Sequence, residues 1–140
     1  MKIKNIVPML ATGDMEASIR FYRETLGFEV RDRFESGGRI WWCELARDGQ
    51  ALMLTQHEVD VSKPGAREGF VQTSINLYLD SGIEALHERL ATQDRSISDL
   101  RVTFYGIKEF ELRDPAGYTL LIGQATIEPP TVLNENVPPF

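Results

Sequence analysis

The sequence predicts an α+β fold in which two βαβββ units form a curved, mixed eight-stranded sheet around a cleft. The first observation behind this prediction is an internal repeat: the segment 44–56 (ELARDGQALMLTQ) aligns with 111–124 (ELRDPAGYTLLIGQ) after a single one-residue gap. The second is that the same order of strand and helix patterns occurs in both halves of the chain. A repeat of this kind indicates that duplicated units organise the fold.

The first unit begins with a strand and a helix. Ile3–Ala11 is apolar and extended, and Pro8 within it favours an edge strand or a bulge. Asp14 is a good N-cap, and apolar residues follow it at helical spacing up to Gly27, which suits the position just after a helix. These signals predict a helix over Met15–Leu26.

Three further strands complete the first unit. They are predicted at Phe28–Phe34, Arg39–Ala46 and Ala51–Gln56, and the hairpin sequences ESGG and RDGQ separate them. Residues 57–69 are polar and contain Pro64-Gly65, so we interpret this segment as the connection between the units.

The second unit repeats the order of the first. Its predicted elements are a strand at Thr73–Leu79, a helix at Ile83–Ala91, a short strand near Ser96–Ser98, and a closing hairpin of Ile107–Leu112 and Tyr118–Ile122. We expect a single domain over residues 1–126, with repeat units at about 3–56 and 72–125. Residues 127–140 form a Pro-rich tail that wraps over the surface or a partner subunit, or is disordered.

Composition predicts one compact, cytoplasmic domain. The chain has 140 residues, and no apolar run approaches the roughly 20 residues of a membrane helix or the apolar segment of a signal peptide. The single cysteine, Cys43, cannot form an internal disulfide and is expected to pack in the core, which agrees with a reducing compartment. A net charge of −6 without a Lys/Arg cluster argues against nucleic acid as a partner.

Several short motifs carry a resemblance to a known family. They are Pro8-Met9-Leu10, Asp14, Ser18, Phe21-Tyr22, Leu26-Gly27-Phe28, Tyr105-Gly106, Glu109-Phe110 and Asp114-Pro115-Ala116-Gly117. In this order and spacing the chain resembles the glyoxalase/bleomycin resistance/dioxygenase family, also called vicinal oxygen chelate. That family includes isomerases, ring-cleaving dioxygenases, thiol transferases and non-enzymatic proteins that sequester bleomycin-type drugs. The resemblance implies a homodimer, with the ligand cleft at the junction of paired chains and strands often exchanged.

The resemblance also indicates where enzymatic members hold a divalent metal with His, Gln and Glu. The corresponding positions here are Val7, Met53, Ser74 and Leu121. Apolar, thioether and hydroxyl side chains do not suit a divalent ion, so we expect neither a metal nor another cofactor. His57 and His87 are expected to face solvent, and no nucleophile has an evident histidine partner. A relocated metal site that uses Glu44 and Glu111 stays open as an alternative.

Strand alternation predicts which side chains line the cleft. Met53 and Leu121 define the inward parity, whereas Cys43, Leu45, Phe110 and Leu112 should pack on the helices. Glu44 and Glu109 share the cleft side and are interpreted as solvated edge charges, and Glu111 could hold a cationic ligand group or an arginine. The candidate ligand-binding residues are Met9, Phe34, Trp42, Met53, Asn76, Tyr78, Phe104, Tyr105, Glu111 and Leu121.

Aromatic residues strengthen the ligand-binding interpretation. The resemblance places Tyr105 where bleomycin-sequestering relatives carry an aromatic side chain that stacks on the drug. Trp42, Phe34 and Phe104 could add flat apolar walls for a planar ligand. The alternative for Trp41 and Phe104 is that they fill core or dimer contacts.

The sequence therefore predicts a metal-free, dimeric binding protein of the bleomycin-resistance type, which sequesters a hydrophobic, partly cationic small molecule without catalysis. One alternative is a lyase, isomerase or dioxygenase of the same fold whose metal ligands have moved. Another is a subunit whose cleft is filled by its own tail and which serves assembly only.

Overall fold

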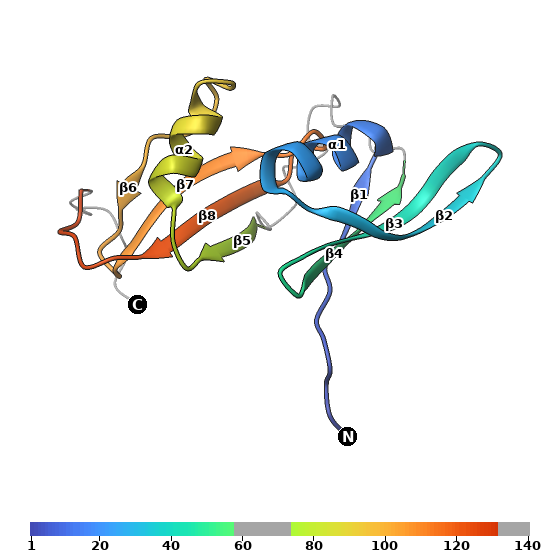
Figure 1. Ribbon diagram of the computed structural model, residues 1–140, viewed down its shortest axis with the longest axis horizontal. Coiled ribbons are helices and arrows are strands. Elements are labelled where there is room, and N and C mark those ends of the chain that lie inside the picture. The colour runs from blue at the N-terminus through green and yellow to red at the C-terminus, as the bar shows by residue number, and fades with distance from the viewer. Residues whose placement is uncertain (58–73, 132–140) are drawn as a thin grey trace, which may run out of the picture. The chain divides into compact units, whose positions relative to one another are not determined.

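The computed structural model describes residues 1–57 and 74–131. Within this part, the chain forms eight strands and two helices, and each half has the order strand, helix, three strands (Figure 1). It divides into two compact units. The first unit is Met1–Val71 with the turn Asp114–Gly117, and the second is Gln72–Arg113 with Tyr118–Phe140.

The first unit places helix α1 against one face of a four-stranded sheet. Its elements are β1 (Met9–Thr12), α1 (Met15–Leu26), β2 (Glu29–Ser36), β3 (Arg39–Arg47) and β4 (Gln50–Gln56). The strand order is β1-β4-β3-β2, with β1 parallel to β4 and antiparallel pairing elsewhere. β2 and β3 form the long hairpin drawn in cyan and green in Figure 1.

Local signals determine both ends of α1. The Asp14 carboxylate accepts a hydrogen bond from the Ala17 backbone N–H at 3.0 Å, as an N-cap should. At the other end, Gly27 has φ 71°, and its N–H bonds the Arg23 carbonyl at 3.0 Å. This left-handed conformation suits glycine, which has no Cβ to clash with the backbone. The predicted helix bounds are therefore confirmed.

A helix also packs against the sheet of the second unit. The elements are β5 (Ser74–Leu79), α2 (Ile83–Ala91), β6 (Arg101–Val102), β7 (Ile107–Arg113) and β8 (Thr119–Ala125). Their strand order is β5-β8-β7-β6, with β5 parallel to β8. The order matches that of the first unit, so the predicted α+β fold of two βαβββ units is confirmed.

The core of each unit lies between its helix and one sheet face. In the first unit, Cys43 and Leu45 are fully buried, and α1 contributes Met15, Ile19, Tyr22 and Leu26. The second unit buries Phe110, Leu112, Leu120 and Ile122 on the sheet and Ile83 and Leu90 on α2. The predicted helix-facing parity, including core packing of Cys43, is confirmed.

Two strand predictions are wrong. The first strand begins at Met9 and not at Ile3, and Pro8 stands just before it. The short strand of the second unit is Arg101–Val102, whereas Ser96 lies in a turn where its N–H and hydroxyl both donate to the Asp94 carboxylate. This side-chain competition for backbone bonds disfavours a strand at 96–98.

The beginning of the tail packs on its own unit. Thr131 donates its N–H to the Val102 carbonyl at 3.0 Å and accepts the Val102 N–H through its hydroxyl at 2.8 Å. The rest of the predicted tail, and residues 58–69 of the connection predicted at 57–69, lie outside the described residues. Neither described helix is long and apolar enough to cross a membrane.

Candidate functional site

The candidate residues of the first unit lie on the sheet face that α1 does not cover. Met9 and Met53 are register partners across β1 and β4, and Met53 in turn stands opposite Glu44 on β3. Trp42 stands opposite Phe34 on β2. Met9 is 58% exposed and Phe34 is 59% exposed, so this face presents large apolar side chains to solvent.

Glu44 is the carboxylate of this face, and it is paired. The Arg31 Nε donates to Glu44 Oε1 at 2.6 Å. This hydrogen bond lowers the pKa of Glu44 below its ordinary value and raises the pKa of Arg31 above its ordinary value. Both groups therefore stay charged at neutral pH, and Glu44 is an ion-pair partner and not a lone edge charge.

A row of four residues crosses the sheet of the second unit on its helix-free face. Tyr78 on β5 is opposite Gly123 on β8, Gly123 is opposite Glu109 on β7, and Glu109 is opposite Arg101 on β6. A Cβ at Gly123 would lie 3.2 Å from the Tyr78 ring and 3.0 Å from the Ile107 Cγ2. The site is therefore tight, because the Tyr78 ring lies close to the strand backbone at Gly123.

Glu109 is the centre of this row. It is 7% exposed, and its Oε1 accepts hydrogen bonds from Arg101 Nε at 3.2 Å and from Arg101 Nη2 at 3.0 Å. The Tyr105 hydroxyl donates to the same oxygen at 3.3 Å. Burying a carboxylate is costly unless it is hydrogen-bonded and paired in this way. The interpretation of Glu109 as a solvated edge charge is therefore wrong.

The β6–β7 turn positions Tyr105 beside this pair. Thr103 donates its N–H to the Ile107 carbonyl at 2.8 Å and accepts the Ile107 N–H through its hydroxyl at 3.1 Å. Gly106 takes φ 80°, which closes the turn. Phe104 and Tyr105 are 45% and 57% exposed, with their rings edge to face at 5.0 Å. Burial and the nearby Glu109 charge raise the pKa of Tyr105, so its hydroxyl stays protonated and able to donate.

The other candidates of the second unit follow the same face. Asn76 and Leu121 are register partners, and Glu111 stands opposite Leu121 on β7. Asn76 accepts a hydrogen bond from the Ser74 hydroxyl at 3.0 Å. Glu111 lies 4.0 Å from Arg113, so its charge has a cationic neighbour. All ten candidates therefore belong to these two helix-free faces or to the turn beside one of them: Met9, Phe34, Trp42 and Met53 in the first unit, and Asn76, Tyr78, Phe104, Tyr105, Glu111 and Leu121 in the second.

The residues at the family's metal positions do not fit a divalent ion. Val7 stands before β1, and neither Val7 nor Leu121 has a side-chain atom that can bind a metal. The other two positions offer only the Met53 thioether and the Ser74 hydroxyl. Among the described residues, no group of three or more His, Cys, Asp and Glu side chains could hold a metal ion. Hard and borderline cations require carboxylate or imidazole ligands.

One histidine is placed differently from its prediction. His57 is exposed, as expected. His87 is half-buried on α2, where its Nε2 lies 2.8 Å from the Ser98 carbonyl oxygen and its ring packs edge to face on Phe110 at 5.0 Å. The prediction that His87 faces solvent is therefore wrong, and its role is to join α2 to the sheet.

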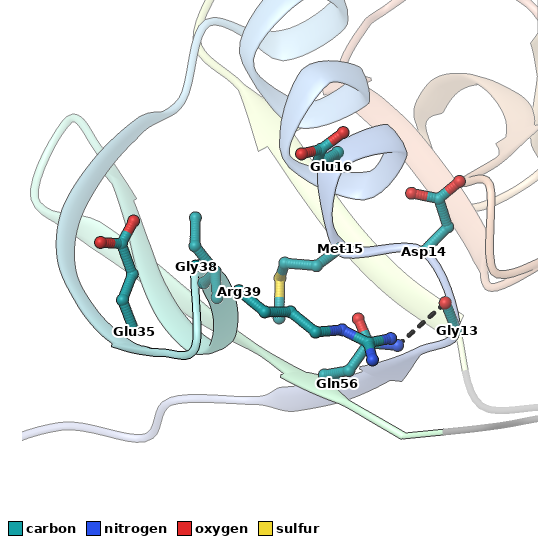
Figure 2. Close-up of a pocket in the computed structure, with 9 residues that line it drawn as sticks. Gly13, Asp14, Met15, Glu16, Glu35, Gly38, Arg39 and Gln56 are labelled. Carbon is teal, nitrogen blue, oxygen red and sulfur yellow. Dashed lines mark hydrogen bonds between the residues drawn. The ribbon is translucent and has the colours of Figure 1, made fainter.

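Sequence reasoning missed an open cavity at the N-terminus of α1, with a volume of about 340 Å³. Figure 2 shows the N-cap Asp14 and Glu16 of α1 on one side and Glu35 and Arg39 of the β2–β3 hairpin on the other. Gln56 borders it and donates to the Gly13 carbonyl at 2.9 Å. None of the ten candidate residues lines this cavity. Its signal in the sequence was charged residues on both sides of Gly37-Gly38, which sequence reasoning treated only as a hairpin.

A comparison with models of protein families shows which family the chain belongs to. Residues 2–122 match the Glyoxalase/Bleomycin resistance protein/Dioxygenase superfamily. The chain belongs to this superfamily. The fold agrees with this assignment, because it is similar to the solved structures of a bleomycin-binding protein and a lactoylglutathione lyase. The resemblance seen in the sequence is thereby confirmed.

Proteins with different activities are similar to this chain. An iron-dependent extradiol dioxygenase from Rhodococcus jostii (strain RHA1) is 27% identical over 130 residues, which are 82% of this chain and 41% of that protein. The chain thus spans less than half the length of this curated relative.

Two solved structures illustrate the same range. The bleomycin-binding protein from bleomycin-producing Streptomyces verticillus, in complex with copper(II)-bleomycin, is 25% identical with a TM-score of 0.59, over 91% of this chain and 99% of that one. The lactoylglutathione lyase from Agrobacterium tumefaciens is 22% identical with a TM-score of 0.63, over 88% and 95% of the two chains. Superfamily membership therefore does not determine the activity.

Proposed function

We propose that this chain is a metal-free small-molecule-binding protein of the bleomycin-resistance type. It acts as a homodimer in the cytoplasm and sequesters a hydrophobic, partly cationic molecule by stoichiometric binding. Sequestration of a drug would give antibiotic resistance without catalysis.

One observation carries the proposal. The helix-free faces combine exposed apolar side chains with metal positions that have no suitable ligands. Tyr78 is 67% exposed and Tyr105 is 57% exposed, and both belong to the second unit. Monomeric soluble proteins rarely leave such side chains clustered in the open unless they bind something. Aromatic walls that lack metal ligands suit stacking on a flat ligand better than polarisation of a substrate.

The similar bleomycin-binding protein supports the same proposal. Its copper(II)-bleomycin complex shows that this fold can bind such a drug in that protein. Sequestration needs affinity only, so it agrees with the absence of an evident nucleophile and base at the candidate residues.

Calorimetric titration with metal-free bleomycin tests the proposal. We expect submicromolar binding at two drugs per dimer. Tyr105→Ala should weaken it by about two- to tenfold, since one aromatic stack contributes about 0.5 to 1.5 kcal/mol beyond burial. Absence of heat at high drug concentration would reject the bleomycin-type function.

The chain offers a matched pair of tryptophans as a control. Trp42 lies on the helix-free face, whereas its neighbour Trp41 has the opposite parity, donates to the Ser36 carbonyl and stacks under Arg39 at 5.0 Å. Trp42→Ala should weaken drug binding, and Trp41→Ala should leave it nearly unchanged. Equal losses in the two variants would argue that the effect is structural. Sedimentation velocity of the same samples tests the homodimer.

A second candidate function is a metal-dependent lyase, isomerase or dioxygenase with relocated ligands. The sequence match to the iron-dependent extradiol dioxygenase favours it. Metal analysis of protein purified without chelators separates the two functions. About one tightly held ion per chain would favour the enzyme, and a metal content near zero that does not rise on incubation with Fe²⁺ would favour sequestration.

A further inference from the structure

The guanidinium of Arg101 donates hydrogen bonds to Glu109 along one edge, and its other edge has donors available for a ligand. Its Nε and Nη2 both donate to Glu109 Oε1, at 3.2 and 3.0 Å, so the edge that these two nitrogens form is occupied. The Nη1 has no hydrogen bond to any described residue, and Nη2 keeps a second N–H. Since a guanidinium can also pair through its Nη1/Nη2 edge, one fork of donors stays available.

Exposure shows which member of the pair a ligand can reach. The Arg101 side chain is 42% exposed, whereas that of Glu109 is 9% exposed. Glu109 is thus the buried support and Arg101 the accessible group. An arginine held by a buried carboxylate loses little further side-chain entropy on binding, because its position is already restricted.

The surroundings of Arg101 are aromatic. The Tyr105 hydroxyl shares the Oε1 of Glu109 with Arg101, and the Phe104 ring lies edge to face with that of Tyr105. Tyr78 stands at the other end of the row that contains Gly123, Glu109 and Arg101. The open fork of Arg101 therefore lies on a face that also presents flat apolar side chains.

We infer that Arg101 anchors the carboxylate of an aromatic ligand through its Nη1/Nη2 edge, with Glu109 as the positioning residue and the ligand ring on the Tyr105 side of the face. A planar carboxylate matches two parallel N–H donors. An organic cation fits less well, because the exposed group is the Arg101 cation and the Glu109 side chain is only 9% exposed. The net charge of −6 repels anions at long range, so this recognition must depend on the local fork.

Three probes of one shape test the sign of the anchor. Naphthoate, naphthylmethanol and naphthylmethylammonium carry negative, neutral and positive groups on the same ring system. In calorimetric or NMR titrations of the full chain, naphthoate should bind at least about tenfold more tightly than naphthylmethanol, as a bidentate charged pair predicts. Naphthylmethylammonium should bind no better than the alcohol. Tighter binding of the ammonium probe would overturn the inference.

Variants connect the preference to the two side chains. Arg101→Gln should remove the preference for naphthoate, and Arg101→Lys should keep only part of it, since lysine has the charge without the fork. Glu109→Gln keeps an acceptor for Arg101 and Tyr105 and removes the opposing charge. It should bind naphthoate at least as tightly as the unaltered chain.

A double variant covers the case in which Arg101→Gln leaves an unpaired buried carboxylate and does not fold. Arg101→Gln with Glu109→Gln buries no charge, and circular dichroism establishes whether it is folded. It should bind the three probes alike. A folded double variant that still prefers naphthoate would overturn the inference.

This site goes beyond the sequestration of bleomycin and does not depend on it. A chain that gives no heat with bleomycin but binds naphthoate through Arg101 would reject the bleomycin-type function and retain the carboxylate site. The reverse pattern would retain sequestration and reject this inference.

Discussion

The Tyr22 hydroxyl donates a 2.7 Å hydrogen bond to Asp114 Oδ2, across 92 residues of sequence. Tyr22 is fully buried on α1, and Asp114 is 5% exposed in the turn between β7 and β8. The first unit therefore includes a turn, Asp114–Gly117, whose flanking strands belong to the second.

Tyr22→Phe tests the strength of this bond. The change removes the hydroxyl and keeps the ring, so we expect a loss of about 1–3 kcal/mol in the free energy of unfolding, because a buried carboxylate loses a donor. Urea unfolding followed by circular dichroism measures it. Tyr78→Phe is the control, since that ring is 67% exposed, and it should change stability by less than about 0.5 kcal/mol. Equal effects of the two changes would contradict the assigned role.

Asp14→Ala tests the cap of α1. The variant loses the acceptor for the Ala17 N–H, and the expected cost is about 0.5–2 kcal/mol in unfolding free energy. Asp14→Ser should recover most of this cost because serine also caps helices. If the alanine and serine variants unfold at the same urea concentration, the cap is not what stabilises this end of the helix.

Gly123→Ala tests the close approach of Tyr78. Its φ is ordinary, so the obstacle is steric: the new methyl would meet the Tyr78 ring and Ile107. We expect a loss of about 1–3 kcal/mol, as for other overpacked sites. In a Tyr78→Ala background the same change should cost less, and a double-mutant cycle from thermal unfolding measures the coupling. Strict additivity would show that Tyr78 is not the residue displaced.

Lys108→Met tests an ion-pair cluster on the α2 side of the sheet. The Lys108 Nζ contacts Glu84 at 2.7 Å and also Glu128. Hydrogen bonds from Lys108 lower the pKa of both carboxyls, and those to Glu128 and Glu84 raise the pKa of Lys108. The contribution of the two carboxylates to the free energy of unfolding is therefore fully present above the unfolded Glu pKa of about 4.3. It is lost as the pH falls through their lowered pKa values in the folded state.

The contribution of Lys108 follows the opposite direction. This stabilisation is fully present below the unfolded Lys pKa of about 10.4 and is lost as the pH rises through the raised pKa of Lys108 in the folded state. The stability advantage of the unaltered chain over Lys108→Met should thus be constant near neutral pH and shrink in acid. Chemical denaturation over a pH series measures it. Lys4→Met, at an exposed position, should show no such pH dependence. An advantage that persists at strongly acidic pH would exclude the ion pairs as its source.

Features with local causes were predictable from the sequence. The bounds of both helices agree with their predictions, and for α1 the cause is a capping side chain and a glycine that act within one turn. Strand parity was also predictable, because a shift of one residue would turn the apolar Cys43 and Leu45 to the opposite face of the sheet. Both side chains are fully buried.

Features that depend on distant partners were not predictable. β6 has only two residues and is held by β7 and by Thr131, so no local pattern marks it. Glu109 was interpreted as a solvated charge because its partner, Arg101, pairs with it only through that short strand. A sequence prediction of a hairpin with its turn at Phe104–Gly106 would have placed Arg101 opposite Glu109. His87 was misplaced for a similar reason, since Phe110 and Ser98 become its neighbours only in the folded unit.

The interleaved turn Asp114–Gly117 has a consequence for any attempt to divide the protein. A peptide of Met1–Val71 would carry Tyr22 without its acceptor, and a peptide that starts at Gln72 would contain the acceptor Asp114 without the Tyr22 hydroxyl that donates to it. Neither half is self-sufficient at this point, so the two peptides mixed together should be better protected from proteolysis than either alone. The repeated halves are therefore mutually dependent parts of one chain.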